Sequence, residues 1–172
     1  MAQKQLDPKA RWMFAIGSFF GWAIAIIFLA FQGFLVFQEF GWDGLSLLWI
    51  PFVLVVPFLI AWAYGVLSYK FYFYELTDDG FRKESGIIWK KYTTIPYDRI
   101  QNVDINRGVI ARILGLSDLN IQTAGASGGS YGAWGMVAVG AEGSVPGLAK
   151  ETAEQLRDEL IRKAKSARTP GI

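Results

Sequence analysis

Two long stretches without a charged residue dominate the N-terminal half of the chain. Residues 12–38 and residues 44–69 contain no Asp, Glu, Lys, Arg or His and are mostly aliphatic or aromatic. Because a helix rises about 1.5 Å per residue, each stretch is long enough to cross the roughly 30 Å hydrocarbon core of a bilayer. The pattern therefore predicts a hairpin of two transmembrane helices over residues 12–69. The alternative for such stretches is a pair of helices buried in a protein core.

Basic residues flank the predicted hairpin unevenly. Lys4, Lys9 and Arg11 precede the first stretch, whereas the loop over residues 39–43 has two acids and no base. The other fourteen basic residues lie from Lys70 onward. The positive-inside rule then places both termini in the cytoplasm and the loop outside. We therefore expect a multi-pass protein of the inner (cytoplasmic) membrane, with a cytoplasmic segment at residues 1–11.

Small residues recur at four-residue spacing in both predicted spans. The first span has Gly17, Gly21 and Ala25, and the second has Ala61 and Gly65. Because small side chains let helix backbones approach closely in lipid, these faces are candidates for packing within the hairpin or against other copies. Chance spacing in a glycine-rich apolar sequence is the alternative. The spans have no ionisable residue, which argues against a pump or a proton-coupled transporter.

From Lys70 onward charges return and apolar positions alternate with a period near two, which is typical of β-strands. Thr77–Gly80 has the composition of a hairpin turn. Residues 108–114 are predicted to form a short helix or turn. The strand candidates are residues 71–76, 81–85, 88–95, 100–105, 119–123, 136–139 and 141–145.

Apolar residues at helical spacing predict an amphipathic helix over residues 151–165. Acids near its start and bases near its end suit the helix dipole. Residues 166–172 are predicted to be a flexible tail. Residues 70–165 are thus expected to form a cytoplasmic domain of the α+β or all-β class, a small barrel or split sandwich closed by a C-terminal helix. The apolar positions of that helix are Ala153, Leu156, Leu160, Ile161 and Ala164.

Composition restricts the chemistry that this chain can perform. None of the 172 residues is Cys or His, which removes disulfides, thiolate and imidazole catalysis and most transition-metal sites. A net charge of +2 gives no field suited to nucleic acid. Gly125–Gly129 matches the G-x-S-x-G pattern of a serine nucleophile, yet that arrangement needs a histidine base. We therefore expect no enzyme, no cofactor, no metal and no nucleic-acid partner.

Two groups of side chains are candidates for contacts at the membrane surface. One is a basic set that would contact anionic lipid headgroups, with ordinary solvated strand faces as the alternative. The other is the aromatic pair Tyr131 and Trp134, within the glycine-rich stretch at residues 125–135. That pair would insert into the membrane interface or dock on a neighbouring subunit, with a mobile loop as the alternative. The basic set is Lys70, Arg82, Lys83, Lys90 and Lys91.

Four segments of the C-terminal part resemble the bacterial pleckstrin-homology-like (PH-like) family: residues 74–80, 95–103, 107–115 and 119–125. YdbS-like membrane proteins of that family carry two helices before the domain, and the resemblance covers roughly residues 10–165. It implies a seven-stranded, partly open barrel plugged by the C-terminal helix, and it supplies no catalytic residues. Roles that it implies are membrane-associated assembly and envelope stress resistance.

These observations predict a non-enzymatic integral membrane protein whose cytoplasmic PH-like domain mediates protein association. The expected partners are the lipid bilayer, further copies of the chain in a homo-oligomer, and other membrane proteins. Two alternatives remain open at this stage. The domain would instead sense anionic lipid through its basic set, or oligomerised hairpins would form a pore or a transporter component.

Overall fold

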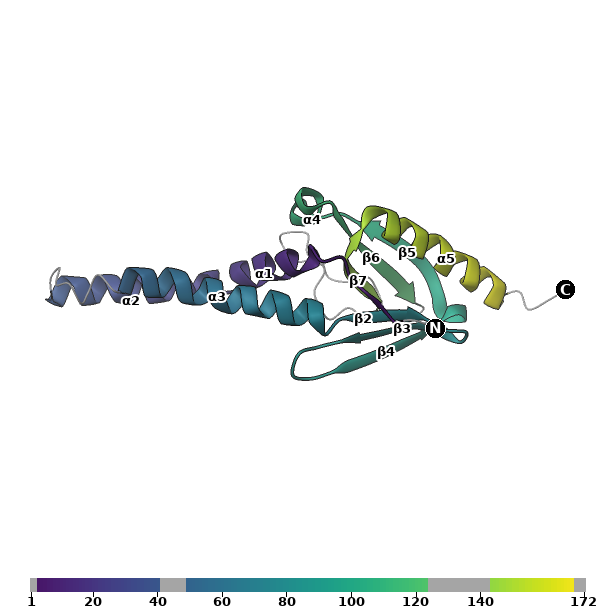
Figure 1. The fold of residues 1–172 in the computed structure, drawn as a ribbon, viewed down its shortest axis with the longest axis horizontal. Coiled ribbons are helices and arrows are strands. Elements are labelled where there is room, and N and C mark those ends of the chain that lie inside the picture. Colours follow the sequence, from purple (N-terminus) through teal and green to yellow (C-terminus); the bar gives the residue numbers. More distant parts are fainter. Residues whose placement is uncertain (1–2, 41–48, 124–142, 169–172) are drawn as a thin grey trace.

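The computed structural model describes residues 3–40, 49–123 and 143–168. Three helices form an elongated stalk, and a domain of two β-sheets and two further helices lies at one end of it (Figure 1). The stalk helices are α1 (Ala10–Gly21), α2 (Ala23–Phe40) and α3 (Trp49–Lys70). α3 runs beside α1 near the domain and beside α2 further out.

The first apolar stretch forms two helices, so the prediction of one continuous helix over residues 12–38 is wrong. The break lies at Trp22, whose N–H donates to the carbonyls of both Ser18 (3.1 Å) and Phe19 (3.2 Å). Gly21 precedes it, and glycine has a low helical propensity and often marks helix bends. Ala10–Gly21 and Ala25–Leu35 meet at an angle of 50°.

The apolar helices of the stalk differ in how far they could extend through a membrane. Within residues 3–40, 49–123 and 143–168, no single helix is long and apolar enough to cross a bilayer. The bent pair Ala10–Gly21 and Ala25–Leu35 together satisfies the length and composition, and Val55–Lys70 is a shorter apolar helix.

The N-terminal segment is part of the domain. β1 (Lys4–Gln5) pairs with β2 (Phe73–Leu76), and Leu6 is buried beside it. Three residues of α1, Ala10, Met13 and Phe14, also lie in the domain's hydrophobic core. The core thus crosses the boundary that the sequence suggested at residue 11.

Two antiparallel sheets make up the rest of the domain. The first has the order β1-β2-β3-β4 and the second the order β5-β6-β7. α4 (Val109–Leu114) connects β5 to β6, and η2 (Tyr97–Arg99) connects the two sheets. The remaining strands are β3 (Gly80–Ser85), β4 (Lys91–Pro96), β5 (Ile100–Asn106), β6 (Leu116–Thr123) and β7 (Ser144–Ala149).

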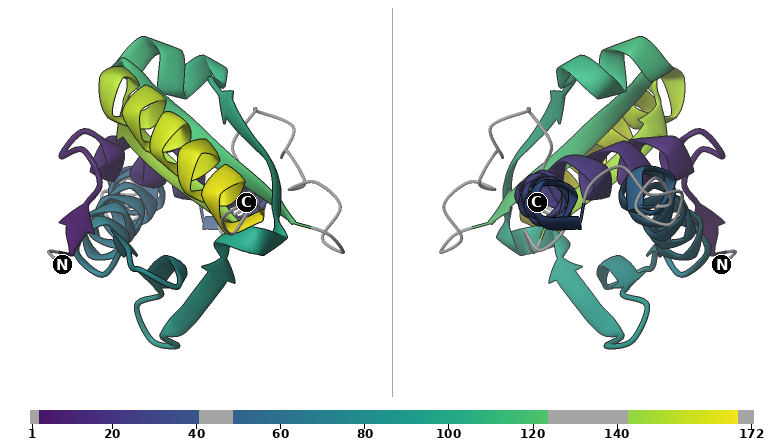
Figure 2. Two further views of the ribbon diagram at one scale, coloured as in Figure 1. Left: turned by 90° about the vertical axis from the view of Figure 1, so that its right-hand side faces the viewer. Right: turned by 90° about the vertical axis from the view of Figure 1, so that its left-hand side faces the viewer.

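The C-terminal helix α5 (Lys150–Arg168) lies diagonally across the second sheet (Figure 2). Ala153, Leu156, Leu160 and Ala164 are buried, so the predicted apolar face of this helix is confirmed. The helix continues past the predicted end at residue 165, so the first part of the expected tail is helical.

The strand predictions differ from the structure in places. β4 begins at Lys91, because residues 87–89 form the turn of the β3–β4 hairpin. The last strand is Ser144–Ala149, later than the predicted 141–145. The predicted strand at 136–139 and the glycine-rich stretch, with Tyr131 and Trp134, lie outside the described residues.

Candidate interaction surface

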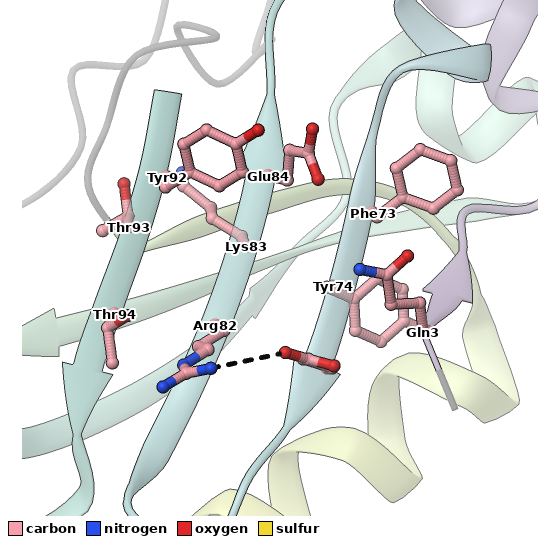
Figure 3. Close-up of a pocket in the computed structure, with 10 residues that line it drawn as sticks. Gln3, Phe73, Tyr74, Arg82, Lys83, Glu84, Tyr92, Thr93 and Thr94 are labelled. Atoms are coloured by element: carbon pink, nitrogen blue, oxygen red, sulfur yellow. Dashed lines mark ion pairs between the residues drawn. The ribbon is translucent and has the colours of Figure 1, made fainter. Parts of the chain in front are cut away.

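The outer face of the first sheet carries a shallow hollow of about 230 Å³ (Figure 3). Antiparallel register sets Phe73 opposite Glu84 and Glu75 opposite Arg82, and continues to Tyr92 and Thr94 on β4. Because directly opposed residues share one face of a sheet, these six side chains gather on the side away from the core. The residues that line the hollow are Gln3, Phe73, Tyr74, Glu75, Arg82, Lys83, Glu84, Tyr92, Thr93 and Thr94.

Charges on this face are paired. Arg82 lies 4.0 Å from Glu75, and the Lys90 amine donates to Glu84 Oε1 at 3.0 Å. The hydrogen bond from Lys90 to Glu84 raises the pKa of Lys90. Tyr92 projects from the same face with 69% of its surface exposed. Tyr92 and Arg82 are of the residue types that are enriched at protein interfaces.

The last strand of this sheet has a free side among the described strands. β4 pairs with β3 and with no other described strand. Strands at a sheet edge present unpaired N–H and C=O groups, which an extended segment of another chain can join. The hollow and the β4 edge are adjacent, because Tyr92 and Thr94 belong to both.

The structure disperses the basic set that the sequence suggested for lipid contact. Lys83 is buried, and its amine donates to the Ser144 carbonyl at 3.0 Å, so Lys83 has to be removed from the set. Arg82 faces outward beside Glu75, while Lys90 and Lys91 lie at the β3–β4 hairpin and Lys70 ends α3. Lys83 shares its strand face with the buried Phe81 two residues away, and this alternation was the signal that sequence reasoning missed.

A buried polar cluster joins the two sheets behind this face. The Tyr72 hydroxyl donates to the Ser144 carbonyl at 2.7 Å, beside the bond from Lys83. Asp118 accepts the N–H of Gly147 at 2.9 Å and is 1% exposed. Burial, followed by the charge of Asp118, raises the pKa of Tyr72. The cluster holds β7 in place.

Asp118 is expected to make the protein less stable as pH rises from about 4 to about 6. Burial raises its pKa from 3.8 to about 6, and the Gly147 hydrogen bond only partly offsets this. The folded state binds the Asp118 proton more tightly than the unfolded chain does. The stabilisation that this proton provides is therefore complete below pH 3.8 and is lost as the pH rises through 6. The loss amounts to about 3 kcal/mol. Denaturation of the wild type and Asp118→Asn across this range measures it, and equal pH slopes for the two would contradict it.

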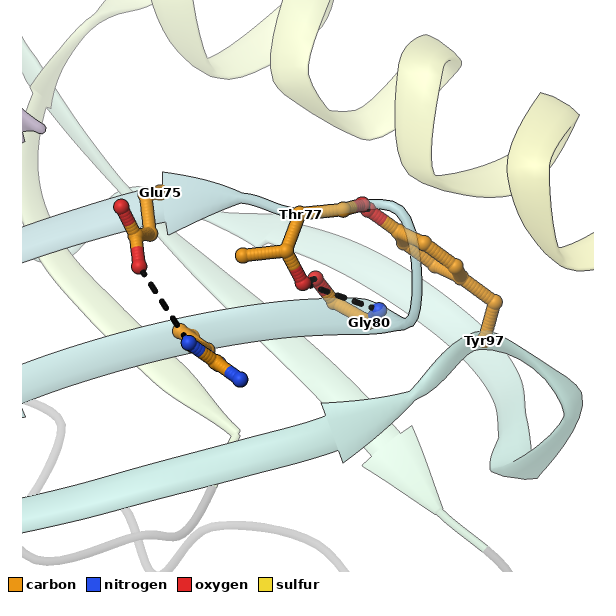
Figure 4. A network of polar contacts seen from close by, with 5 residues as sticks. Glu75, Thr77, Gly80 and Tyr97 are labelled. Atoms are coloured by element: carbon orange, nitrogen blue, oxygen red, sulfur yellow. Dashed lines mark hydrogen bonds and ion pairs between the residues drawn. The ribbon is translucent and has the colours of Figure 1, made fainter. Parts of the chain in front are cut away.

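The β2–β3 turn is anchored to the C-terminal helix at the end of the domain away from the stalk. The Thr77 hydroxyl accepts the N–H of Gly80, and the Tyr97 hydroxyl donates to the Thr77 carbonyl at 2.7 Å (Figure 4). The Lys163 amine donates to the same carbonyl and lies 5.1 Å from the Tyr97 ring centre. Burial, with Glu159 and Asp78, raises the pKa of Tyr97 to about 12, so its hydroxyl remains a donor at neutral pH.

The predicted helix-packing residues fall into two groups. Ala61 and Gly65 are buried against α1, where an added Cβ on Gly65 would lie 2.8 Å from that of Ala15. A Cβ added to Gly21 meets no atom within 4 Å, and Gly17 and Ala25 are half-buried. The second-span pair thus packs the stalk internally. Among the described residues, no group of three or more Asp or Glu side chains is placed to hold a metal ion.

Comparison with known proteins identifies the family of the chain. The family model of the bacterial PH domain matches residues 14–164, which include both the stalk and the domain. The chain belongs to the bacterial PH domain family. The resemblance seen in the sequence is thereby confirmed.

This bacterial PH domain protein also has a curated relative. The chain is 30% identical over 108 residues to the transmembrane protein YdbT of Bacillus subtilis (strain 168). The match covers 63% of this chain and 20% of YdbT, so the chain spans one fifth of the relative's length. No solved structure matches the chain.

Proposed function

We propose that this bacterial PH domain protein is a non-enzymatic membrane-anchored module whose domain binds other proteins, including further copies of itself. The observation that carries the proposal is the outer face of the first sheet. There the exposed Tyr92 and the hollow adjoin β4, whose second edge no described strand covers. Strand addition gives affinity through the backbone, and the neighbouring side chains give specificity.

Membrane anchoring is the second part of the proposal, and the stalk supports it. Charge-free sequence covers most of α1–α3, and large apolar side chains such as Phe28, Phe31 and Phe58 are more than half exposed. A surface of this kind is stable in lipid and not in water. The name of YdbT, a transmembrane protein, is in keeping with this. We place the domain and both termini on the cytoplasmic side, following the flanking basic residues.

Lipid recognition by a basic pocket has less support than protein association. Lys83 is buried, and Arg82 and Lys90 lie beside Glu75 and Glu84, so the predicted basic set forms no cationic cluster. Aromatic side chains such as Tyr92 and arginines such as Arg82 are the residue types enriched at protein interfaces. Assembly through this face would serve the envelope stress resistance that the sequence resemblance implied.

Particle mass in mild detergent and in lipid nanodiscs tests the proposal. We expect wild type to contain more than one copy and Tyr92→Lys to dissociate at least about tenfold more readily, because a charge replaces the exposed aromatic contact. Gln155→Lys adds the same charge on the exposed face of α5 and is the matched control. A single copy at every concentration would refute self-association, and unchanged assembly of Tyr92→Lys would remove this face from it.

A further inference from the structure

The tip of the β3–β4 hairpin exposes two large apolar side chains. Ile88 is 84% exposed and Trp89 is 85% exposed, and both lie in the turn that begins at Gly86 (φ 115°). Neither residue belongs to the hydrophobic core of the described domain. Single apolar residues scattered on a surface are common, whereas adjacent large apolar side chains on a protruding turn indicate an interaction site.

Helix α4 exposes a second apolar pair. Val109 is 66% exposed and Ile113 is 78% exposed, and residues four apart lie on the same face of a helix. The opposite face already packs inward, because Ala111 is buried and Ile110 and Leu114 contact the core. The outward pair is therefore not needed to attach α4 to the domain.

Both features lie at the end of the domain from which the stalk emerges. Figure 1 shows α4 above the stalk and the hairpin turn below it, each directed toward the side where α1–α3 leave the domain. The views along the stalk in Figure 2 confirm that α4 and the hairpin lie on opposite sides of the helices. The two apolar pairs thus flank the stalk at its junction with the domain.

We propose that these two pairs insert into the interfacial layer of the same bilayer that holds the stalk, so that the domain is docked on the membrane at two points. This inference rests on the membrane anchoring proposed above. Trp is favoured at the membrane–water interface, and Trp12, Trp62 and Tyr64 expose aromatic surface on the adjacent stalk. The apolar surface of the stalk and that of the two pairs therefore face the same lipid.

Dispersed basic residues lie next to both apolar pairs, although they form no headgroup-binding cluster and Lys90 is already bonded to Glu84. Lys90 and Lys91 follow the hairpin tip, Arg112 lies within α4, and Lys70 ends α3 at the junction. Basic residues close to a membrane surface are attracted to its anionic lipids. Apolar side chains flanked by bases are the usual composition of a segment that lies in the interface.

Docking at two points has a consequence for the interaction surface. A domain joined to its stalk alone is free to tilt, whereas contacts on opposite sides of the stalk hold it at one angle to the membrane. The β4 edge and the hollow around Tyr92 belong to the same hairpin as the inserted tip. Docking would therefore present this face to partners at a fixed height above the lipid.

Single-cysteine labelling of the full chain tests the docking, because the natural sequence contains no cysteine. An environment-sensitive fluorophore is attached at Trp89→Cys or Ile113→Cys, in vesicles of phosphatidylcholine with a minority of phosphatidylglycerol. Nitroxide groups near the headgroups or deep in the acyl chains serve as quenchers. We expect shallow quenchers to remove most of the emission at both sites. Phe28→Cys on α2 reports on anchoring and should respond to deep quenchers, while Gln155→Cys on α5 should respond to neither.

The outcomes separate the docking from the anchoring. Quenching at position 28 without quenching at 89 and 113 would overturn the docking and leave the anchoring in place. Absence of quenching at position 28 would overturn the anchoring itself. A third outcome is that position 89 is protected from an aqueous quencher but does not respond to nitroxide lipid. If this protection disappears when each vesicle holds one copy, a second copy covers the hairpin tip. That result would also overturn the docking.

Discussion

Replacing Gly65 by alanine is expected to lower the free energy of unfolding by about 2 kcal/mol, since overpacking a tight contact costs about 1–3 kcal/mol. An added Cβ would lie 2.8 Å from both the backbone nitrogen and the Cβ of Ala15, and would also meet the Arg11 carbonyl oxygen. Backbone atoms have little freedom to move, so α1 and α3 have to separate. Thermal unfolding in detergent, followed by circular dichroism, measures the change.

Gly21→Ala is the matched control for this prediction. Gly21 ends α1, the helix against which Gly65 of α3 packs. A Cβ added to Gly21 meets no atom within 4 Å. Alanine at that position is expected to leave the stability unchanged or raise it by up to about 1 kcal/mol, the difference in helical propensity. Equal destabilisation by the two substitutions would show that helix–helix contact at Gly65 is not what the glycine provides.

Local patterns in the sequence were enough to predict the elements whose contacts are close along the chain. The Thr77–Gly80 turn is recognisable because a threonine side chain and a glycine three positions later close a hairpin without any distant residue. α5 is recognisable because its apolar residues share one face. These elements follow from periodicity and turn chemistry alone.

Contacts between distant parts of the chain were not predictable in the same way. β1 pairs with β2, a strand nearly seventy residues later in the chain, and no local pattern in the two-residue β1 predicts this pairing. Met13 and Phe14 read as the start of an apolar span, yet they pack in the domain core. Apolar residues favour burial in lipid and in a protein core alike, so hydrophobicity alone does not distinguish the two.

The candidate surface was visible in the sequence only in part. Arg82 and Lys90 were recognised as residues of adjacent strands, but the hollow depends on the register that sets Glu75 opposite Arg82. The exposed Trp89 was assigned to a strand, because alternation continues past the residues that pair. Whether the strand after the turn begins at residue 88 or at residue 91 depends on pairing, which one strand alone does not determine.

Replacing Gly147 by alanine is expected to destabilise the protein by about 3 kcal/mol, combining about 1–2 kcal/mol for the left-handed backbone with about 1–3 kcal/mol for overpacking. Gly147 has φ of 68°, and an added Cβ would lie 2.6 Å from the Cβ of Ala10 on α1. Its N–H donates to Asp118, and its carbonyl accepts the N–H of Asp7. Displacement of this residue therefore disturbs β7, the N-terminal segment and α1 together. Denaturation monitored by circular dichroism is the measurement.

Two further variants separate the cost of the left-handed backbone at Gly147 from the cost of the contact between its added Cβ and Ala10. Gly115 has φ of 73° and open space around it, so Gly115→Ala carries the backbone cost alone and should destabilise by about 1 kcal/mol. Ala10→Gly removes the atom that Gly147→Ala would meet. The double variant should therefore be more stable than the sum of the two single effects by about 1–2 kcal/mol, a coupling expected only for residues in contact. Additive effects would mean that α1 does not rest on β7 at this point, and that the stalk and the domain are joined less closely than the buried Ala10 indicates.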